Sequence, residues 1–403
     1  MSKIFVVGIA DSLLSARQKE LLAECVLIVG AERLRDMASI SNIRYQQITP
    51  LTEAIATLRS TLPTGNVAVL ASGDPLFYGI GRKLLNEFPR ESIDFFPALS
   101  SIQRGCALFR IPWDDAKVTS LHGRSPEHLP GLLLSESKHL LLTDAANSPD
   151  RIAGKLLDYL ALIGETELPT SIRMLAAEDI GLSTERLFSG SLTEACQERF
   201  STLNIVCMLV PGVPAPPAYR FGLTEDLLHH SRGLITKNEV RAATLHHLRL
   251  PETGVFWDVG AGSGSLSIEA ARSNPRLTIY AVEQKAEELQ NIKNNIVKFR
   301  CFNIVPVAGR APEALAALPD PDRIFVGGSS GALSTIVPLA ASRMAKDGIL
   351  VINGVAEKTI RTAPGLMQQQ GFTVHASVVQ VSRTDSDGNT RIFNPITIMT
   401  GTR

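Results

Sequence analysis

The chain has 403 residues, of which 44% are hydrophobic and 20% charged, and its 40 Lys and Arg residues balance its 40 Asp and Glu residues. This length predicts two or three domains, and the composition is typical of a globular protein with a buried core. The balance of charge excludes a chain-wide basic field that would attract nucleic acid, so any anionic ligand must be bound by local arginine and lysine side chains.

The five cysteines are scattered, odd in number and without a CxxC pair. This usage favours reduced thiols in a cytoplasm over a disulfide framework or a zinc site. No apolar run is long enough to span a bilayer, and the N-terminus lacks the pattern of a signal peptide. We therefore expect a cytoplasmic protein with no membrane partner.

Residues 4–210 alternate short apolar runs with segments of helical periodicity, such as Leu51–Leu58 and Leu76–Leu85. Such alternation predicts an α/β fold with largely parallel strands. The predicted strands are Ile4–Val7, Val26–Val29, Val67–Leu70, Ile93–Phe95, Leu140–Leu142, Ile172–Leu175 and Ile205–Val210.

The most informative stretch of this half is Val67–Gly81, where a strand runs into Gly73-Asp74-Pro75 and a glycine-containing helical pattern follows. Asp74 is expected to cap that helix and Pro75 to occupy its first turn. The stretch is either a well-capped turn or a ligand loop at the carboxyl end of a strand, where α/β sheets bind ligands.

Ser72-Gly73-Asp74-Pro75, with Tyr78-Gly79, resembles the signature of the tetrapyrrole methylases, the class III S-adenosylmethionine (SAM) methyltransferases. Pro97–Ser101, Ser120–Arg124 and Leu141–Asp144 also resemble this family, whereas Val6–Asp11 matches in part, with Ala10 where the family usually has glycine. The resemblance implies a fold of two α/β subdomains. It implies SAM contacts from Gly8, Ser72, Gly73, Asp74, Tyr78, Ser100, Ser101 and Thr143.

Arg124 and His122 each have two interpretations. A loop arginine is usually solvated, and a lone histidine is more often structural than catalytic. Within the family, Arg124 becomes a candidate for binding a substrate carboxylate through its planar guanidinium.

Pro211–Pro217 is expected to be a stiff, extended linker because proline restricts the backbone. We therefore divide the chain into residues 1–210, a linker of residues 211–232, and residues 233–403. Thr236 and Glu239 have the spacing of a helix capping box, and Lys237 and Arg241 would share one face of that helix. The neighbouring His246 and His247 would point different ways, so no metal site is expected.

Val255–Glu269 is the stretch around which the second half is organised: a buried strand, glycines at 260, 262 and 264, and a helix start. Glycine permits positive φ and close approach of a ligand, and helix N-termini bind polar or anionic groups. A second strand ends at Glu283, about 20 residues further on, the spacing at which an acid meets ribose hydroxyls. Ser265 stands where a nicotinamide fingerprint needs its third glycine.

This pattern resembles a class I SAM methyltransferase with a Rossmann-like fold, which implies SAM contacts from Asp258, Gly260, Gly262, Gly264, Glu283, Gly309 and Ala311. A nicotinamide site or a glycine turn without a ligand are the alternatives. Glycines also follow the predicted strands at Val305–Ala308 and Arg323–Val326. They indicate either simple turns or one ligand crevice at the carboxyl ends of the strands.

Thr236–Arg241, Asp258–Glu269 and Ile324–Ser329 resemble, in this order, the decarboxylating cobalt-precorrin-type methyltransferase module of corrin-ring synthesis. A tetrapyrrole methylase followed by this module is the layout of the fused precorrin methyltransferases of cobalamin biosynthesis. The resemblance implies two SAM sites and methylation of a precorrin macrocycle at C5 and C15 with loss of carbon dioxide from its C12 acetate. It assigns C5 to the first domain and the other two steps to the second.

Substrate contacts are expected from Arg124, Lys237, Arg241, Gly327 and Gly328, and no catalytic acid or base stands out. Methyl transfer from a sulfonium requires alignment more than proton transfer, which fits this absence. We expect a homo-oligomer. The alternatives are a methylase fused to a nicotinamide-dependent dehydrogenase and a non-catalytic scaffold of the pathway.

Overall fold

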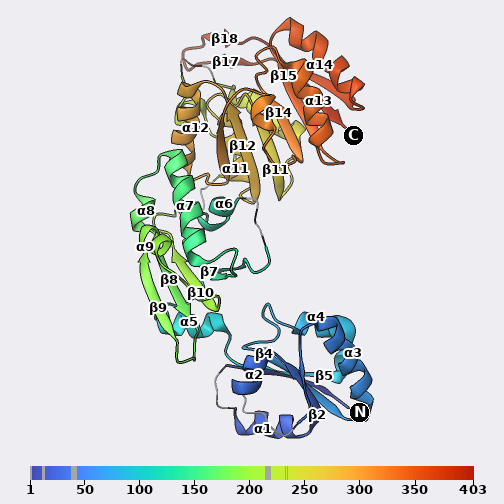
Figure 1. Ribbon diagram of the computed structural model, residues 1–403. Coiled ribbons are helices and arrows are strands. Elements are labelled where there is room, and N and C mark those ends of the chain that lie inside the picture. The colour runs from blue at the N-terminus through green and yellow to red at the C-terminus, as the bar shows by residue number, and fades with distance from the viewer. Residues whose placement is uncertain are drawn as a thin grey trace. The chain divides into compact units, whose positions relative to one another are not determined.

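The computed structural model describes residues 2–10, 14–37, 43–124, 126, 128–213, 219–231, 233 and 235–403, so Asp11 and residues 214–218 and 232 of the expected linker lie outside it. The chain forms two compact units (Figure 1). The first comprises residues 1–125, 138–153 and 172–209, and the second comprises residues 126–137, 154–171 and 210–403. Two segments of the first half thus pack with the second half, and the boundaries at 210 and 233 stay predictions.

The first unit begins with a sheet and the helices that cover it. The elements are β1 (Ile4–Ile9), α1 (Ala16–Ala23), β2 (Cys25–Gly30), α2 (Glu32–Met37), β3 (Tyr45–Gln47), α3 (Leu51–Thr61), β4 (Asn66–Ser72), α4 (Gly81–Glu87) and β5 (Ile93–Phe96). The five strands pair in parallel in the order β3-β2-β4-β1-β5. The central strands are apolar on both faces, as in a sheet covered by helices on both sides. Ile4 and Val6 pack with α3 and α4, whereas Phe5 and Val7 pack with α1 and the segment of α2.

A second five-stranded sheet follows. The elements are α5 (Ser101–Phe109), β6 (Lys117–Ser120), α6 (Leu129–Leu133), β7 (Lys138–Leu142), α7 (Pro149–Ile163), α8 (Leu168–Ser171), β8 (Arg173–Glu178), β9 (Arg186–Ser191), α9 (Leu192–Gln197) and β10 (Asn204–Leu209). The order is β6-β7-β10-β8-β9, and among these described strands only the β6–β7 pair is parallel. The expectation of largely parallel strands is therefore wrong for this sheet, because apolar periodicity does not encode strand direction. Ile102 and Cys106 of α5 pack against it.

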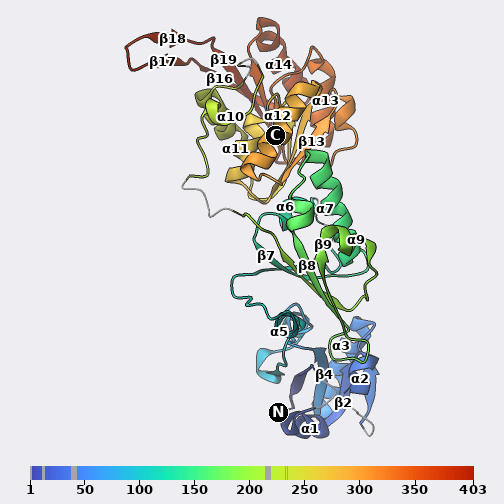
Figure 2. The ribbon, with the colours of Figure 1, turned by 90° about the vertical axis from the view of Figure 1, so that its left-hand side faces the viewer.

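The second unit contains a seven-stranded sheet (Figures 1 and 2). Its strands are β11 (Gly254–Val259), β12 (Leu277–Glu283), β13 (Ile304–Ala308), β14 (Arg323–Val326), β15 (Ile349–Gly354), β16 (Thr373–Val379) and β19 (Ile396–Thr402). The order is β13-β12-β11-β14-β15-β19-β16, and of these described strands only β19 runs against its neighbours. The chain leaves β11 toward one edge and returns at β14 toward the other, which places a ligand crevice at the carboxyl end of β11.

Further helices and a small hairpin complete this unit, and its core contains Trp257, Ile324 and Leu350. The further elements are α10 (Asn238–Leu248), α11 (Ser265–Ser273), α12 (Ala286–Phe299), α13 (Leu333–Arg343), α14 (Glu357–Gln369), β17 (Ser382–Thr384) and β18 (Thr390–Ile392), with 3-10 turns in the chain at Leu62–Thr64, Arg90–Ser92, Glu225–Leu227 and Glu313–Leu315.

Two predicted helix caps are wrong. The Asp74 carboxylate accepts the Leu76 N–H at 2.8 Å in a tight turn, and α4 begins only at Gly81. Thr236 is not the cap of α10, which begins after Lys237 and has no side-chain cap. The Glu239 carboxylate is drawn away by Arg383, whose guanidinium donates to it at 2.7 and 3.0 Å.

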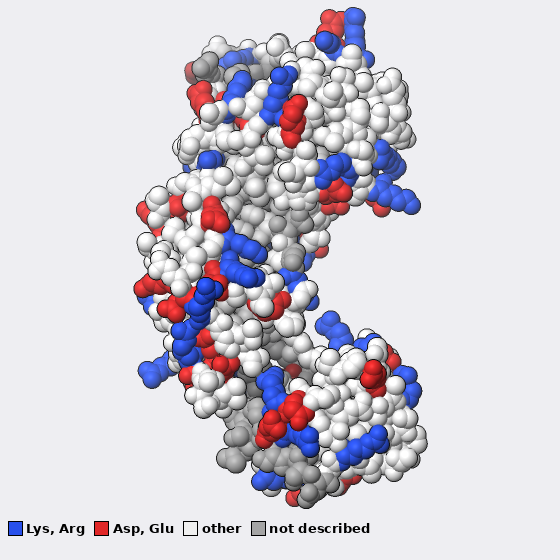
Figure 3. Space-filling model, viewed as in Figure 1, with Lys and Arg blue, Asp and Glu red and all other residues white. Residues whose placement is uncertain are grey.

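None of the helices in the described residues is long and apolar enough to cross a membrane. On the face shown in Figure 3, basic and acidic side chains are interspersed.

Candidate cofactor and substrate sites

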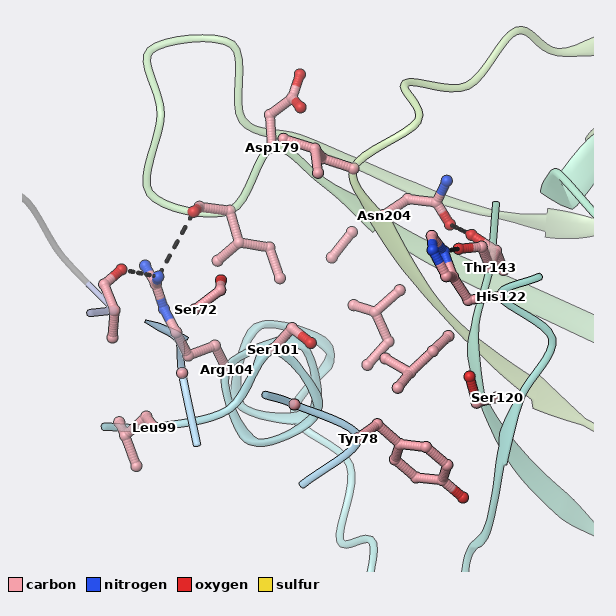
Figure 4. A pocket seen from close by; sticks show the side chains of 18 of the residues that line it. Ser72, Tyr78, Leu99, Ser101, Arg104, Ser120, His122, Thr143, Asp179 and Asn204 are labelled. Atoms are coloured by element: carbon pink, nitrogen blue, oxygen red, sulfur yellow. Dashed lines mark hydrogen bonds between the residues drawn. The ribbon is translucent and has the colours of Figure 1, made fainter. Parts of the chain in front are cut away.

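The first unit contains a cavity of about 820 Å³ where the carboxyl ends of β1 and β4 meet the second sheet (Figure 4). Figure 4 shows Ser72 and Ser101 on one side and Ser120, His122 and Thr143 on the other. A volume of several hundred Å³ is typical of ligand sites. The predicted site residues that line the cavity are Ser72, Gly73, Tyr78, Ser101, Arg124 and Thr143.

Gly8, Asp74 and Ser100 do not line this cavity, and each has a structural role. A side chain on Gly8 would overlap the Gly73 carbonyl oxygen, so the loop after β4 approaches β1 closely because residue 8 lacks a Cβ. Asp74 forms the turn described above. The Ser100 hydroxyl caps α5 by accepting the Gln103 N–H at 3.2 Å. Cofactor contacts from these three residues stay predictions.

Gly73 shapes the loop as well as lining the cavity. It has φ +64°, and a Cβ there would lie 2.9 Å from the Ser100 Cα. A larger residue would strain the backbone besides obstructing a ligand. A loss of SAM binding after substitution of Gly73 would therefore not distinguish an effect on folding from an effect on binding.

Three arginines that sequence reasoning missed, Arg33, Arg82 and Arg104, also line the cavity. Arg104 of α5 donates to the Ala10 carbonyl and, at 3.5 Å, to the Ile180 carbonyl, so one side chain joins loops from both sheets (Figure 4). No sequence motif distinguishes these arginines from solvated ones.

The wall of this cavity is also apolar. Leu76, Tyr78 and Leu99 line it and are 55%, 54% and 58% exposed. Large apolar side chains rarely stay this exposed in a cluster unless they contact a ligand or a partner. Combined with the arginines, they suit a flat apolar ring with acidic substituents.

The second unit contains a cavity of about 220 Å³ at the carboxyl ends of β11, β12 and β14. This is the crevice that the reversal of strand order at β11 predicts. The predicted site residues that line it are Gly260, Gly262, Glu283, Gly309, Ala311 and Gly328, whereas Asp258, Gly264 and Gly327 do not.

The glycine loop has positive φ at Gly260, Gly262 and Gly264. A Cβ on Gly260 would overlap the Gly328 carbonyl oxygen, so this glycine lets two loops touch. A Cβ on Gly262 would meet nothing within 4 Å, so the loop presents an open face to the cavity. Gly264 precedes α11 as its N-cap.

The Glu283 carboxylate joins the glycine loop to the start of α12. One oxygen accepts the Gly262 N–H at 2.9 Å, and the other accepts the N–H groups of Gln284 and Lys285, each at 2.9 Å. Glu283 therefore has the capping role that competes with ribose binding. Its side chain also lines the cavity, and a carboxylate has about four acceptor positions, so a further hydrogen bond is available.

Asp258 lies fully buried beneath the loop. One carboxylate oxygen accepts the Ser267 hydroxyl at 2.5 Å, and the other has no hydrogen-bond partner among the described residues. Burial raises the pKa of Asp258 to about 7, with a smaller increase from Glu283, while the Ser267 hydrogen bond opposes the shift. A perturbed carboxyl with an unsatisfied oxygen is typical of a functional site.

Arg241 is not available for a substrate, and this prediction is corrected. Its side chain is 2% exposed and pairs at 3.4 Å with Glu269, which is 1% exposed. The guanidinium also donates to the Leu223 carbonyl. Lys237 donates to Glu225 at 2.7 Å, so its role toward a substrate stays a prediction.

The described residues hold no group of three or more His, Cys, Asp or Glu side chains that could bind a metal ion. Both cavities suit an organic cofactor such as SAM: each lies at the carboxyl ends of strands beside a glycine turn, and the second adds an acid at ribose spacing.

Two family models match the chain. Residues 3–196 match the tetrapyrrole (corrin/porphyrin) methylases, and residues 227–401 match the precorrin methyltransferase domain. The fold and these matches define the class: a two-module methyltransferase of α/β architecture.

Comparison with known proteins identifies the family within this class. The precorrin-6Y C(5,15)-methyltransferase (decarboxylating) of Sinorhizobium sp is 30% identical over 355 residues, 87% of this chain and 82% of its own. The chain belongs to the precorrin-6Y C(5,15)-methyltransferase (decarboxylating) family. A probable cobalt-precorrin-6B C(15)-methyltransferase of Pyrobaculum calidifontis is 37% identical over 44% of this chain and 94% of its own. A crystal structure from Geobacter metallireducens, described as a precorrin-6Y C5,15-methyltransferase, is 38% identical and covers 46% of this chain and 98% of its own, with a TM-score of 0.45.

Proposed function

We propose that the chain methylates a precorrin-6Y macrocycle at C5 and C15 and removes the C12 acetate carboxyl as carbon dioxide, in cobalamin biosynthesis. The first module, around the 820 Å³ cavity, acts at C5, and the second acts at C15 and on the acetate. The observation that supports this most is the order of the two family matches along one chain, each with its own cavity. The C(15)-methyltransferase relative aligns over 94% of its own length with 44% of this chain. This match supports the assignment of C15 methylation to the second module.

SAM, when bound, supplies an electrophilic methyl group, and the chain's contribution is to bind and align. In the second module, the open face at Gly262 allows close approach of the cofactor, and Glu283, which lines the cavity, accepts one hydrogen bond from a ribose hydroxyl. Alignment of a carbon nucleophile with the methyl group lowers the activation free energy of methyl transfer by about 7–11 kcal/mol. In the first module, Arg33, Arg82 and Arg124 bind ring carboxylates while the exposed leucines contact the ring.

The direct test is incubation of the full chain with SAM and precorrin-6Y, followed by mass spectrometry. We expect a product that has gained two methyl groups and lost one carbon dioxide. A folded chain that binds no SAM would support the scaffold alternative instead. The methyltransferase match over residues 227–401 leaves the dehydrogenase alternative without support.

Glu283→Ala is expected to weaken SAM binding at the second site by about tenfold or more, since a hydrogen bond to a charged group contributes about 1.5–3 kcal/mol. Calorimetric titration of the full chain should show one weakened site and one unchanged site. Glu287→Gln, an exposed carboxylate of α12 outside the cavity, is the matched control. Unchanged affinity in a folded Glu283 variant would leave only the capping role.

Arg124→Ala is expected to raise the KM for precorrin in C5 methylation by about tenfold or more, because a charged hydrogen bond to a substrate carboxylate is lost. Arg124→Lys should restore only part of the affinity, since lysine lacks the planar fork. Stability and C15 methylation should not change. An unaltered C5 rate at low substrate would contradict a substrate role for Arg124.

A further inference from the structure

A strip of the second unit, residues 300–304, runs from the end of α12 to the first residue of β13 and contacts the two segments that come from the tetrapyrrole methylase half. These segments, residues 126–137 and 154–171, contain α6, most of α7 and α8, and belong to the same compact unit as the strip. Figure 2 shows one end of α7 next to β13.

Two side chains of the segments hydrogen-bond to the backbone of the strip. The Tyr159 hydroxyl donates to the Ile304 carbonyl at 2.7 Å, and the His128 Nε2 lies 2.7 Å from the Phe302 carbonyl. The two rings pack edge to face, with centroids 4.8 Å apart. Burial raises the pKa of Tyr159 well above its usual range and lowers the pKa of His128 to about 4, so both rings stay neutral and donate at physiological pH.

The backbones also approach closely. A Cβ on Gly131 of α6 would lie 2.7 Å from the Asn303 Cα, so only glycine fits without a shift of the backbone. The Asn303 amide in turn donates to the Leu277 carbonyl at 2.8 Å, which ties the strip to the start of β12.

An electrostatic attraction acts at one end of the strip. Burial lowers the pKa of Arg300, and the nearby negative charge of Glu165 opposes this shift. The Arg300 guanidinium also donates to the Pro211 carbonyl at 3.3 Å. The α6–α7 segments therefore meet the strip through hydrogen bonds, close backbone packing and an electrostatic attraction.

We propose that residues 300–304 are a docking surface whose partner is the α6–α7 face of the methylase module, and that this surface holds the two halves together without the linker. The inference does not rest on the proposed reaction.

The test cuts the linker in the folded, full-length protein. A recognition sequence for a specific protease, inserted within residues 214–218, allows cleavage after purification. We expect the two fragments to stay associated in size-exclusion chromatography at micromolar concentration. Fragments that separate completely, each still folded by circular dichroism, would overturn the proposal.

Two variants with matched controls locate the interface. Tyr159→Phe removes one hydrogen bond and is expected to weaken association of the cleaved halves about tenfold. Tyr45→Phe removes a similar bond, from the Tyr45 hydroxyl to the Ala31 carbonyl at 2.8 Å in the first unit, and should have no effect. Gly131→Ala should weaken association more strongly, whereas Gly365→Ala, in α14 with open space around it, should not.

Hydrogen exchange on the uncut chain gives a second measurement that does not require cleavage. Gly131→Ala should speed exchange in the peptide that covers residues 300–304, while the glycine loop after β11 keeps its wild-type rate. Equal exchange in the Gly131→Ala and Gly365→Ala proteins would refute docking at this strip.

Discussion

Arg241→Met is expected to destabilise the second compact unit by about 3–5 kcal/mol, because it leaves the Glu269 carboxylate buried without its cation. Both partners are almost fully buried, so water cannot take the place of the lost guanidinium. Glu269 keeps two further donors, the N–H groups of Gly222 at 3.2 Å and Leu223 at 2.6 Å, which favours the lower end of the range.

The double variant Arg241→Met/Glu269→Gln should recover most of this loss. The side-chain carbonyl of the introduced glutamine would still accept the Leu223 N–H, and no uncompensated charge would remain. Arg276→Met is the matched control, because Arg276 pairs with Glu252 at the surface, where ion pairs contribute about 0–1 kcal/mol.

Denaturant unfolding followed by the fluorescence of the buried Trp257 measures these changes in the second unit. Trp113, in the first unit, is replaced by phenylalanine in every variant to isolate the signal. A stable Arg241→Met protein that has lost activity would instead restore the predicted substrate-binding role of Arg241.

Asp258→Asn is expected to stabilise the protein at neutral and alkaline pH by up to about 4 kcal/mol, and not at acidic pH. The pKa of Asp258 rises from 3.8 to about 7 in the folded protein. Well below pH 3.8 the carboxyl is protonated in both the folded and unfolded states, so no charge is buried on folding. As the pH rises toward 7 the unfolded chain ionises first, and the folded state loses stability at about 1.4 kcal/mol per pH unit.

The neutral asparagine side chain of the variant avoids this loss, so the difference in the free energy of unfolding between variant and wild type should grow from pH 4 to pH 7 and then level off. Asp347→Asn, an exposed carboxylate in the same unit, is the control and should show no such growth. A difference that does not vary with pH would show that Asp258 does not titrate in this window. Weaker SAM binding by Asp258→Asn would show that the buried carboxylate lowers stability but is needed for cofactor binding.

Local sequence patterns predicted the main strands and the glycine loops from which the two cavities are built. The apolar runs predicted β1, β4, β11 and β12, since a buried parallel strand leaves a continuous hydrophobic signal. The glycine motifs predicted both crevices, because positive φ and close backbone approach demand glycine locally. Family membership followed from the order of these motifs, and the matches over residues 3–196 and 227–401 confirm it.

The partner that each polar side chain binds, in contrast, depends on the folded structure. Glu239 has the spacing of a capping box, yet it bonds to Arg383, which lies 144 residues away. Arg241 looks like an exposed helical arginine, yet Glu269 holds it in the core. Charge pairing of this kind depends on which segments the fold brings together, and short-range periodicity contains no record of it.

The same reason explains why residues 126–137 and 154–171 belong with the second unit and why the second sheet is mostly antiparallel. Local patterns specify that a segment is a helix or a strand and which face is apolar. The partner that covers that face, and the direction in which a strand pairs, are decided by long-range packing.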